Sequence, residues 1–118
     1  MNLSQEHKNK LQELHKNCVK NYEYKLSPEF LKAYKNIKED PSKTGLYFQV
    51  VACMIKLQHD PGYPGLNSHH YDALDNRYHA KVWESYVQNK TPGAYRIFWH
   101  YTKGQQNHIT LVALTPHP

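Results

Sequence analysis

Side chains suited to acid–base and phosphate chemistry gather near the C-terminal end of the chain. RNA transesterification needs a base for the 2′-hydroxyl, an acid for the leaving 5′-oxygen and a fixed cation for the charge on the phosphorane. Glu84 could be the base, His117 the acid and Arg96 the phosphate clamp. An arginine suits that last role because its guanidinium donates two parallel hydrogen bonds.

Other side chains in the same region could bind a substrate. Tyr86 or His100 could stack on a base or assist proton transfer, and Lys81 completes the set of candidate substrate-binding residues. A structural interpretation also fits these residues. Glu84 and Arg96 could form a cross-strand ion pair on a solvated sheet face, and the terminal histidine could be frayed and inert. The spacing leaves both interpretations open.

Strand alternation decides which of these side chains share a face. Residues 94–101 (AYRIFWHY) are predicted to form a strand. The bulkier set should pack on helices, and it consists of Tyr95, Ile97, Trp99 and Tyr101. The other set, with Arg96 and His100 in it, should project from the open face. If Trp83 belongs to the core, Glu84 and Tyr86 join them on that open face.

The elements that carry these residues read as an antiparallel meander preceded by helices. Residues 78–88, 94–101 and 108–114 are predicted strands, with polar turns at 89–93 and 103–107. The stretch HDPGYPGLNS at 59–68 should be a surface loop, because it holds two prolines and two glycines. The fold class expected from this order is α+β.

Two helices and a short strand should precede the meander. Residues 22–26 alternate as a short strand does, and Ser27-Pro28-Glu29 is a strong helix start. That helix should end before Asp40-Pro41. Residues 46–57 are apolar nearly all round, as in a central buried helix capped by Ser42 or Thr44, although their composition would also suit a strand.

The N-terminal 22 residues are polar and rich in lysine, yet they carry a thin apolar stripe at helical spacing, made by Leu3, Leu11, Leu14, Cys18 and Tyr22. Ser4 could cap this helix. We expect this helix to be an appendage to the domain, either docked on it or frayed.

Bulk properties suit one small basic domain. The chain has 118 residues and a formal net charge of +5. This charge fits a polyanionic partner, nucleic acid or an acidic protein, but also ordinary solubility. The two cysteines form no disulfide framework, and Cys53 should be a buried thiol. No secretion signal or membrane span is evident, so the expected location is the cytoplasm.

Histidine clustering raises the question of a metal site. His59, His69, His70 and His79 fall within a short stretch, but no spacing makes three or four of them converge as zinc requires. The sequence therefore predicts no metal.

Five segments in order resemble the RelE/ParE superfamily of bacterial type II toxin–antitoxin toxins. They are YEYKLSPEFLKAYKNI, LQHDPGYPGLNSHHYDAL, KVWESYV, GAYRIFWHY and ITLVALTPHP. The resemblance covers residues 22–118 and leaves residues 1–21 as a helical extension. It implies a fold of two helices on a mainly antiparallel four-stranded sheet, related to microbial ribonucleases, and a cognate antitoxin as partner. Members similar to RelE, YoeB and HigB cleave mRNA in the ribosomal A site without a metal or cofactor.

By position, Arg96 matches the family's strand arginine at the scissile phosphate, and His117 matches a C-terminal histidine that some members use as general acid. His69 matches a histidine that the resemblance makes structural rather than catalytic. Glu84 and Tyr86 stand where several members have basic residues. The resemblance therefore implies a ribosome-dependent endoribonuclease, with two alternatives: a ParE-like inhibitor of DNA gyrase, or an inactive relative that only binds a protein.

Overall fold

The computed structural model describes residues 3–117, and in this part of the chain five strands form a single mixed sheet in the order β1-β5-β4-β3-β2. The strands are β1 (Glu23–Leu26), β2 (His69–His70), β3 (Trp83–Tyr86), β4 (Tyr95–Tyr101) and β5 (His108–Pro116). The helices are α1 (Gln5–Asn17), α2 (Pro28–Glu39), α3 (Thr44–His59) and α4 (Asp75–Tyr78), with 3-10 turns η1 (Pro41–Lys43) and η2 (Asp72–Leu74). The α+β prediction is confirmed.

The sheet has one strand more than the four expected. Strands β3, β4 and β5 form the predicted antiparallel meander, and β1 pairs with β5 in parallel. The additional strand β2 pairs antiparallel with β3. It is only two residues long and follows a loop rich in proline and glycine, so no alternation could reveal it.

Helix α2 begins and ends where the sequence predicts. The Ser27 hydroxyl accepts a hydrogen bond from the Phe30 amide at 3.0 Å and donates one to the Val112 carbonyl at 2.9 Å, so the cap also ties the helix to β5. The helix ends at Glu39, ahead of Asp40-Pro41.

Helix α3 is confirmed as a helix, and it is longer than the predicted 46–57. The predicted cap is wrong: Lys43 occupies the cap position and no side chain caps the helix. Ser42 lies in the preceding 3-10 turn and binds the Asp40 carboxylate, and Thr44 is already the first residue of α3, where its hydroxyl donates to the Pro41 carbonyl.

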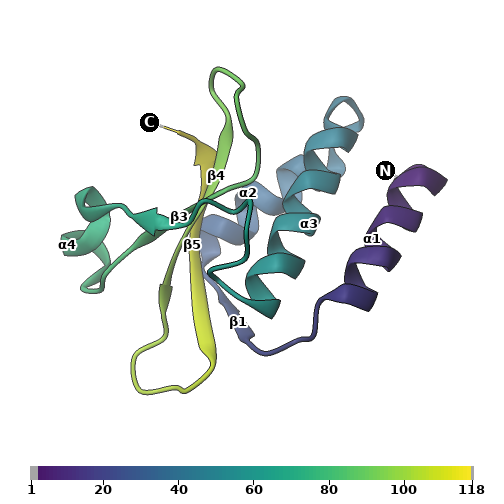
Figure 1. Cartoon of the computed structure of the whole chain (residues 1–118). Helices are drawn as coiled ribbons and strands as arrows, with labels where there is room; N and C mark the ends of the chain where they lie inside the picture. The colour runs from purple at the N-terminus through teal and green to yellow at the C-terminus, as the bar shows by residue number, and fades with distance from the viewer. Residues whose placement is uncertain (1–2, 118) are drawn as a thin grey trace.

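The main core lies between the sheet and helices α2 and α3, which cover the same face of it (Figure 1). Its buried side chains include Phe30, Val50, Leu57, Ile97 and Trp99. The prediction that this face of β4 packs on helices is confirmed for Tyr95, Ile97 and Trp99, and it is wrong for Tyr101, which is exposed at the end of the strand. Cys53 belongs to this core as predicted, and burial raises the pKa of its thiol to about 12.

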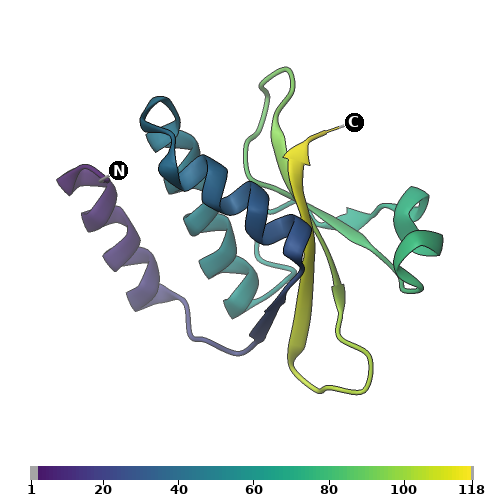
Figure 2. The ribbon, with the colours of Figure 1, turned by 180° about the vertical axis from the view of Figure 1, so that it is seen from behind.

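The other face of the sheet is less open than predicted. Helix α4 stands on the side away from α2 and α3, as Figures 1 and 2 show. A second core cluster lies there, made of Val82, Phe98, Val112 and Ala113 with Tyr71, Leu74 and Tyr78 packed against it.

The predicted strand 78–88 is therefore too long, since its first residue belongs to α4 and β3 starts at Trp83. His79, in the left-handed region at φ 52°, ends the short helix. The Asp75 carboxylate fixes this segment by accepting from the Val82 amide at 2.8 Å and contacting His70 Nε2 at 2.7 Å.

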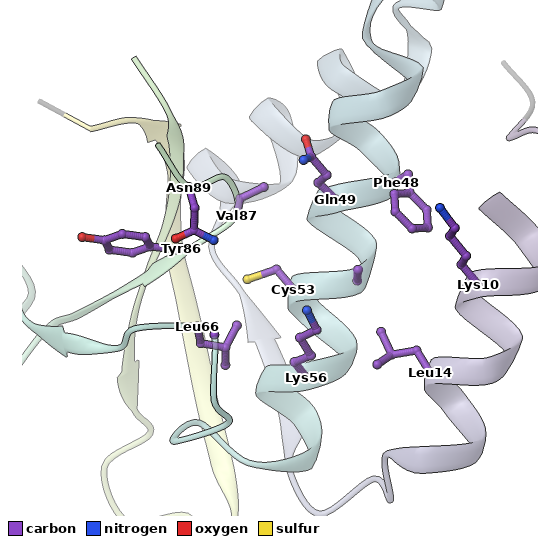
Figure 3. Close-up of a pocket in the computed structure, with 12 residues that line it drawn as sticks. Lys10, Leu14, Phe48, Gln49, Cys53, Lys56, Leu66, Tyr86, Val87 and Asn89 are labelled. Carbon is purple, nitrogen blue, oxygen red and sulfur yellow. The ribbon is translucent and has the colours of Figure 1, made fainter. Parts of the chain in front are cut away.

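Helix α1 runs beside α3 (Figure 1). Ser4 caps it as predicted, by accepting a hydrogen bond from the His7 amide at 3.0 Å. The His7 ring stacks on Phe48 with centroids 4.6 Å apart, yet no residue of α1 is buried. Below this contact, a cavity of about 290 Å³ opens between α1, α3 and the end of β3, with Lys10 and Lys56 at its walls (Figure 3).

None of the helices between residues 3 and 117 is long and apolar enough to cross a membrane.

Candidate functional site

Glu84 is a buried carboxylate at the centre of a polar cluster. It lies in β3 opposite Phe98 of β4, and its side chain is 1% exposed. Its Oε2 is 2.8 Å from His117 Nδ1, and its Oε1 is 3.1 Å from His69 Nε2 and 3.6 Å from Arg96 Nε. One carboxylate therefore meets two imidazoles and a guanidinium, as a buried charge requires.

Strand register brings these residues together from four segments. His69 of β2 pairs with Glu84, and Tyr86 pairs with Arg96 across β3 and β4. His117 follows β5 directly, and its backbone amide donates to the Ala94 carbonyl at 2.9 Å. Glu84, Arg96 and the two histidines therefore converge. His117 is held in place through both its backbone and its ring.

The His117 ring suits proton transfer. A ring Nδ1–H that donates to a carboxylate fixes the tautomer and leaves Nε2 free, as in other carboxylate–histidine pairs. Here the Nδ1 contact is with Glu84, and 45% of the side chain is exposed. The Tyr71 ring lies edge-on to it with centroids 6.2 Å apart.

His69 contacts acceptors through both ring nitrogens. Its Nδ1 is 2.9 Å from the Asn67 carbonyl oxygen, and its Nε2 faces Glu84. The resemblance had pointed to a structural role for this histidine. Its place beside Glu84 depends on β2, which has no recognisable sequence signal.

Arg96 is largely committed to the protein. Its side chain is 9% exposed, and Nη1 donates to the carbonyls of Gln88 at 2.9 Å and Tyr95 at 3.1 Å. The guanidinium lies 3.7 Å from the centroid of the Tyr86 ring, within cation–π range. The predicted cross-strand pair with Glu84 is present, but it is buried and does not lie on a solvated face as that interpretation expects: His69, Tyr86 and His117 pack around it.

Two polar atoms in the cluster have no hydrogen bond. They are Glu84 Oε1 and Arg96 Nε, both buried. His69 Nε2 lies close to that oxygen, but its N–H is not directed along a hydrogen bond. Groups of this kind are uncommon in native structures and are frequent where a ligand binds or a reaction occurs.

Two other candidate substrate-binding residues have different neighbours. The Lys81 ammonium lies 4.8 Å from the centroid of the Trp83 ring, which packs against the main core. His100 contacts the Tyr101 carbonyl through Nδ1, and its ring is 6.5 Å from that of Tyr78. The structure thus places Tyr86 at the cluster, and Lys81 and His100 beside other residues.

Three of the four histidines considered for a metal, His59, His69 and His70, have separate partners. Within residues 3–117, no group of three or more His, Cys, Asp or Glu side chains is placed to hold a metal ion. His59 Nδ1 meets the backbone of Val19, and His70 meets Asp75.

The fold is similar to a solved one. No protein-family model matches the chain, and no curated protein matches it in sequence. The structure of the YoeB dimer from Staphylococcus aureus superposes with a TM-score of 0.59 at 11% identity, over 83% of this chain and 99% of that one. This likeness shows that the chain has a YoeB-like α+β fold.

Proposed function

We propose that this protein is the toxin of a type II toxin–antitoxin module and that it cleaves translated mRNA by metal-independent transesterification. The observation that carries the proposal is the 2.8 Å contact between His117 Nδ1 and Glu84 Oε2, which presents an imidazole with a free Nε2 on the sheet face. The YoeB-like fold supports the toxin class, since YoeB is among the relatives that the sequence resembles.

His117 is the proposed acid. Its imidazolium gives the Nε2 proton to the leaving 5′-oxygen while Nδ1–H stays on Glu84. Arg96 supplies the positive charge that stabilises the phosphorane. Because Arg96 Nη1 is already bound to two carbonyls and Nε is buried beside Glu84, Nη2 carries this role.

Glu84 is the proposed base. Its Oε1 has no hydrogen bond and accepts the proton of the attacking 2′-hydroxyl, so the site gains one proton as His117 loses another. The side chain is 1% exposed, and this step therefore requires His69 to move off Oε1 when RNA binds. In the free protein, the same carboxylate positions His117.

An antitoxin follows from the proposal. A protein of net charge +5 that cleaves mRNA needs a partner that holds it inactive, and an acidic one matches its charge. A small acidic protein encoded beside this one is the partner to test first.

The experiment compares the wild type, His117→Ala and His108→Ala on mRNA bound in ribosomes, with EDTA present. His108 is the matched control, because it is an imidazole at the other end of β5. The proposal expects 2′,3′-cyclic phosphate ends from the wild type and the control, and a loss of at least about 100-fold in His117→Ala. Expression without a partner should arrest growth for the wild type and for His108→Ala, and His117→Ala should not arrest it.

Arrest of replication with intact mRNA, unchanged by His117→Ala, would instead favour the gyrase inhibitor. Harmless expression of the wild type would favour the protein-binding relative.

A further inference from the structure

A small aromatic pocket lies next to the His117–Glu84 pair. Its volume is about 240 Å³, and it opens on the sheet face that carries α4. Phe98 and Ala113 come from the sheet, while Tyr71, Leu74 and Tyr78 come from the segment around η2 and α4. This pocket has no part in the proton transfers described above.

The pocket is continuous with the candidate site. Phe98 lines it and is the cross-strand partner of Glu84. Thr115 also lines it and precedes His117 by two residues in the chain. The Tyr71 ring is a neighbour of both Phe98 and His117, since its centroid lies 5.1 Å from the Phe98 ring and 6.2 Å from the His117 ring. A group bound in the pocket would therefore sit one side chain away from the acid.

The lining offers flat apolar surfaces and a polar rim. At the rim, the Glu29 carboxylate accepts from Arg77 Nη2 at 3.0 Å and from the Tyr78 hydroxyl at 3.3 Å. Burial raises the pKa of the Tyr78 hydroxyl, so it stays a donor at neutral pH. Aromatic walls with a carboxylate and a guanidinium at the edge match an unstacked nucleobase, which has π-faces and an edge of donors and acceptors.

We propose that this pocket binds the base of a nucleotide adjoining the scissile phosphate. The inference rests on the proposed function and adds to it a substrate contact that positions RNA for His117. Tyr71 supplies the shared wall, and the Glu29–Arg77 pair meets the edge of the base.

Filling the pocket tests the idea without removing core packing. Ala73 is an exposed lining residue in η2, so Ala73→Trp places an indole at the pocket. Asn76→Trp is the matched control, since it adds the same bulk to an exposed site in α4 that does not line the pocket. Thermal unfolding shows that each variant folds. Binding is measured by fluorescence anisotropy with an oligonucleotide that carries 2′-deoxyribose at the scissile position.

We expect Ala73→Trp to bind this oligonucleotide about tenfold more weakly than Asn76→Trp, a loss of about 1.4 kcal/mol. An abasic nucleotide beside the scissile position should weaken wild-type binding to a similar extent and leave Ala73→Trp unchanged. Equal binding by the two variants, with no effect of the abasic nucleotide, overturns the pocket while RNA binding by the wild type persists. A wild type that neither binds nor cleaves RNA overturns the proposed function itself.

Discussion

His117 Nδ1 and Glu84 Oε2 lie 2.8 Å apart although 33 residues separate them in the chain. If these two act as a unit, their substitutions are not additive. We expect His117→Ala to lower cleavage by at least about 100-fold, Glu84→Gln to lower it by about tenfold or more, and the double variant to be no slower than His117→Ala. Initial rates on ribosome-bound mRNA measure this. Losses that multiply would mean that the pair acts independently.

Arg96→Ala should lower stability as well as activity. The substitution removes two hydrogen bonds to carbonyls and leaves a buried carboxylate with less positive charge. Breaking a buried pair costs about 3 kcal/mol or more. Urea denaturation measures it, with Arg77→Ala as the control: that arginine is 62% exposed in its ion pair, so its loss should cost about 1 kcal/mol or less. Equal stability of the two variants would contradict the burial argument.

Ser85→Ala should destabilise the fold through a chain of hydroxyl groups. The buried Trp99 Nε1–H donates to the Ser85 hydroxyl at 2.8 Å, which lies 2.7 Å from the Ser68 hydroxyl, and this one donates to the Pro61 carbonyl. Removing the middle hydroxyl leaves the indole N–H unpaired, at a cost of about 1–3 kcal/mol. Chemical denaturation measures the change in the free energy of unfolding. A loss below about 0.5 kcal/mol would show that this series of hydrogen bonds does not stabilise the fold.

Asp75 should make the segment around α4 sensitive to acid. The Val82 amide, more than the neighbouring His70, holds the pKa of this carboxyl below its usual range. A depressed folded-state pKa contributes stability above the unfolded value, near 4, and that contribution is lost as the pH falls through the folded-state pKa. Asp75→Asn should therefore lower Tm at pH 7, and the loss of Tm should shrink as the pH falls below about 4. A constant difference between the two pH values would contradict the linkage.

Removing residues 1–17 should leave a cooperatively folding domain. Helix α1 buries none of its residues and touches the rest mainly through α3, whereas Cys18 is buried. We expect a single unfolding transition with a Tm a few degrees lower, since the His7–Phe48 stack is lost. Differential scanning calorimetry tests this, and loss of cooperativity would make α1 part of the core domain.

The sequence predicts the fold well where local chemistry is strong. Ser27-Pro28 starts α2 as predicted, and alternation in β4 assigns Ile97 and Trp99 to the helix side. It fails where structure depends on distant partners. Asp75 stabilises the segment around α4 by contacting the Val82 amide and His70. The periodicity of the sequence does not predict these contacts.

In the candidate site too, local patterns are predictable from the sequence and contacts with distant partners are not. Alternation puts Glu84, Tyr86 and Arg96 on one face, and the structure has them there. The burial of Glu84 and Arg96 could not be predicted, since their neighbours include His69 of the short strand β2 and His117, which follows β5. His69 reaches Glu84 through a strand two residues long, so its contact was beyond the reach of pattern analysis.

The order β1-β5-β4-β3-β2 places β5, the last strand in the chain, between β1, the first, and β4. Residues 108–116 form the seam that joins β1 to β4, and the α2 cap also bonds to this strand. As the chain leaves the ribosome, α2 and α3 therefore have no complete surface to settle on until β5 emerges. A chain that ends before β5 therefore lacks the strand that joins β1 to β4, and it also lacks His117 of the cluster around Glu84.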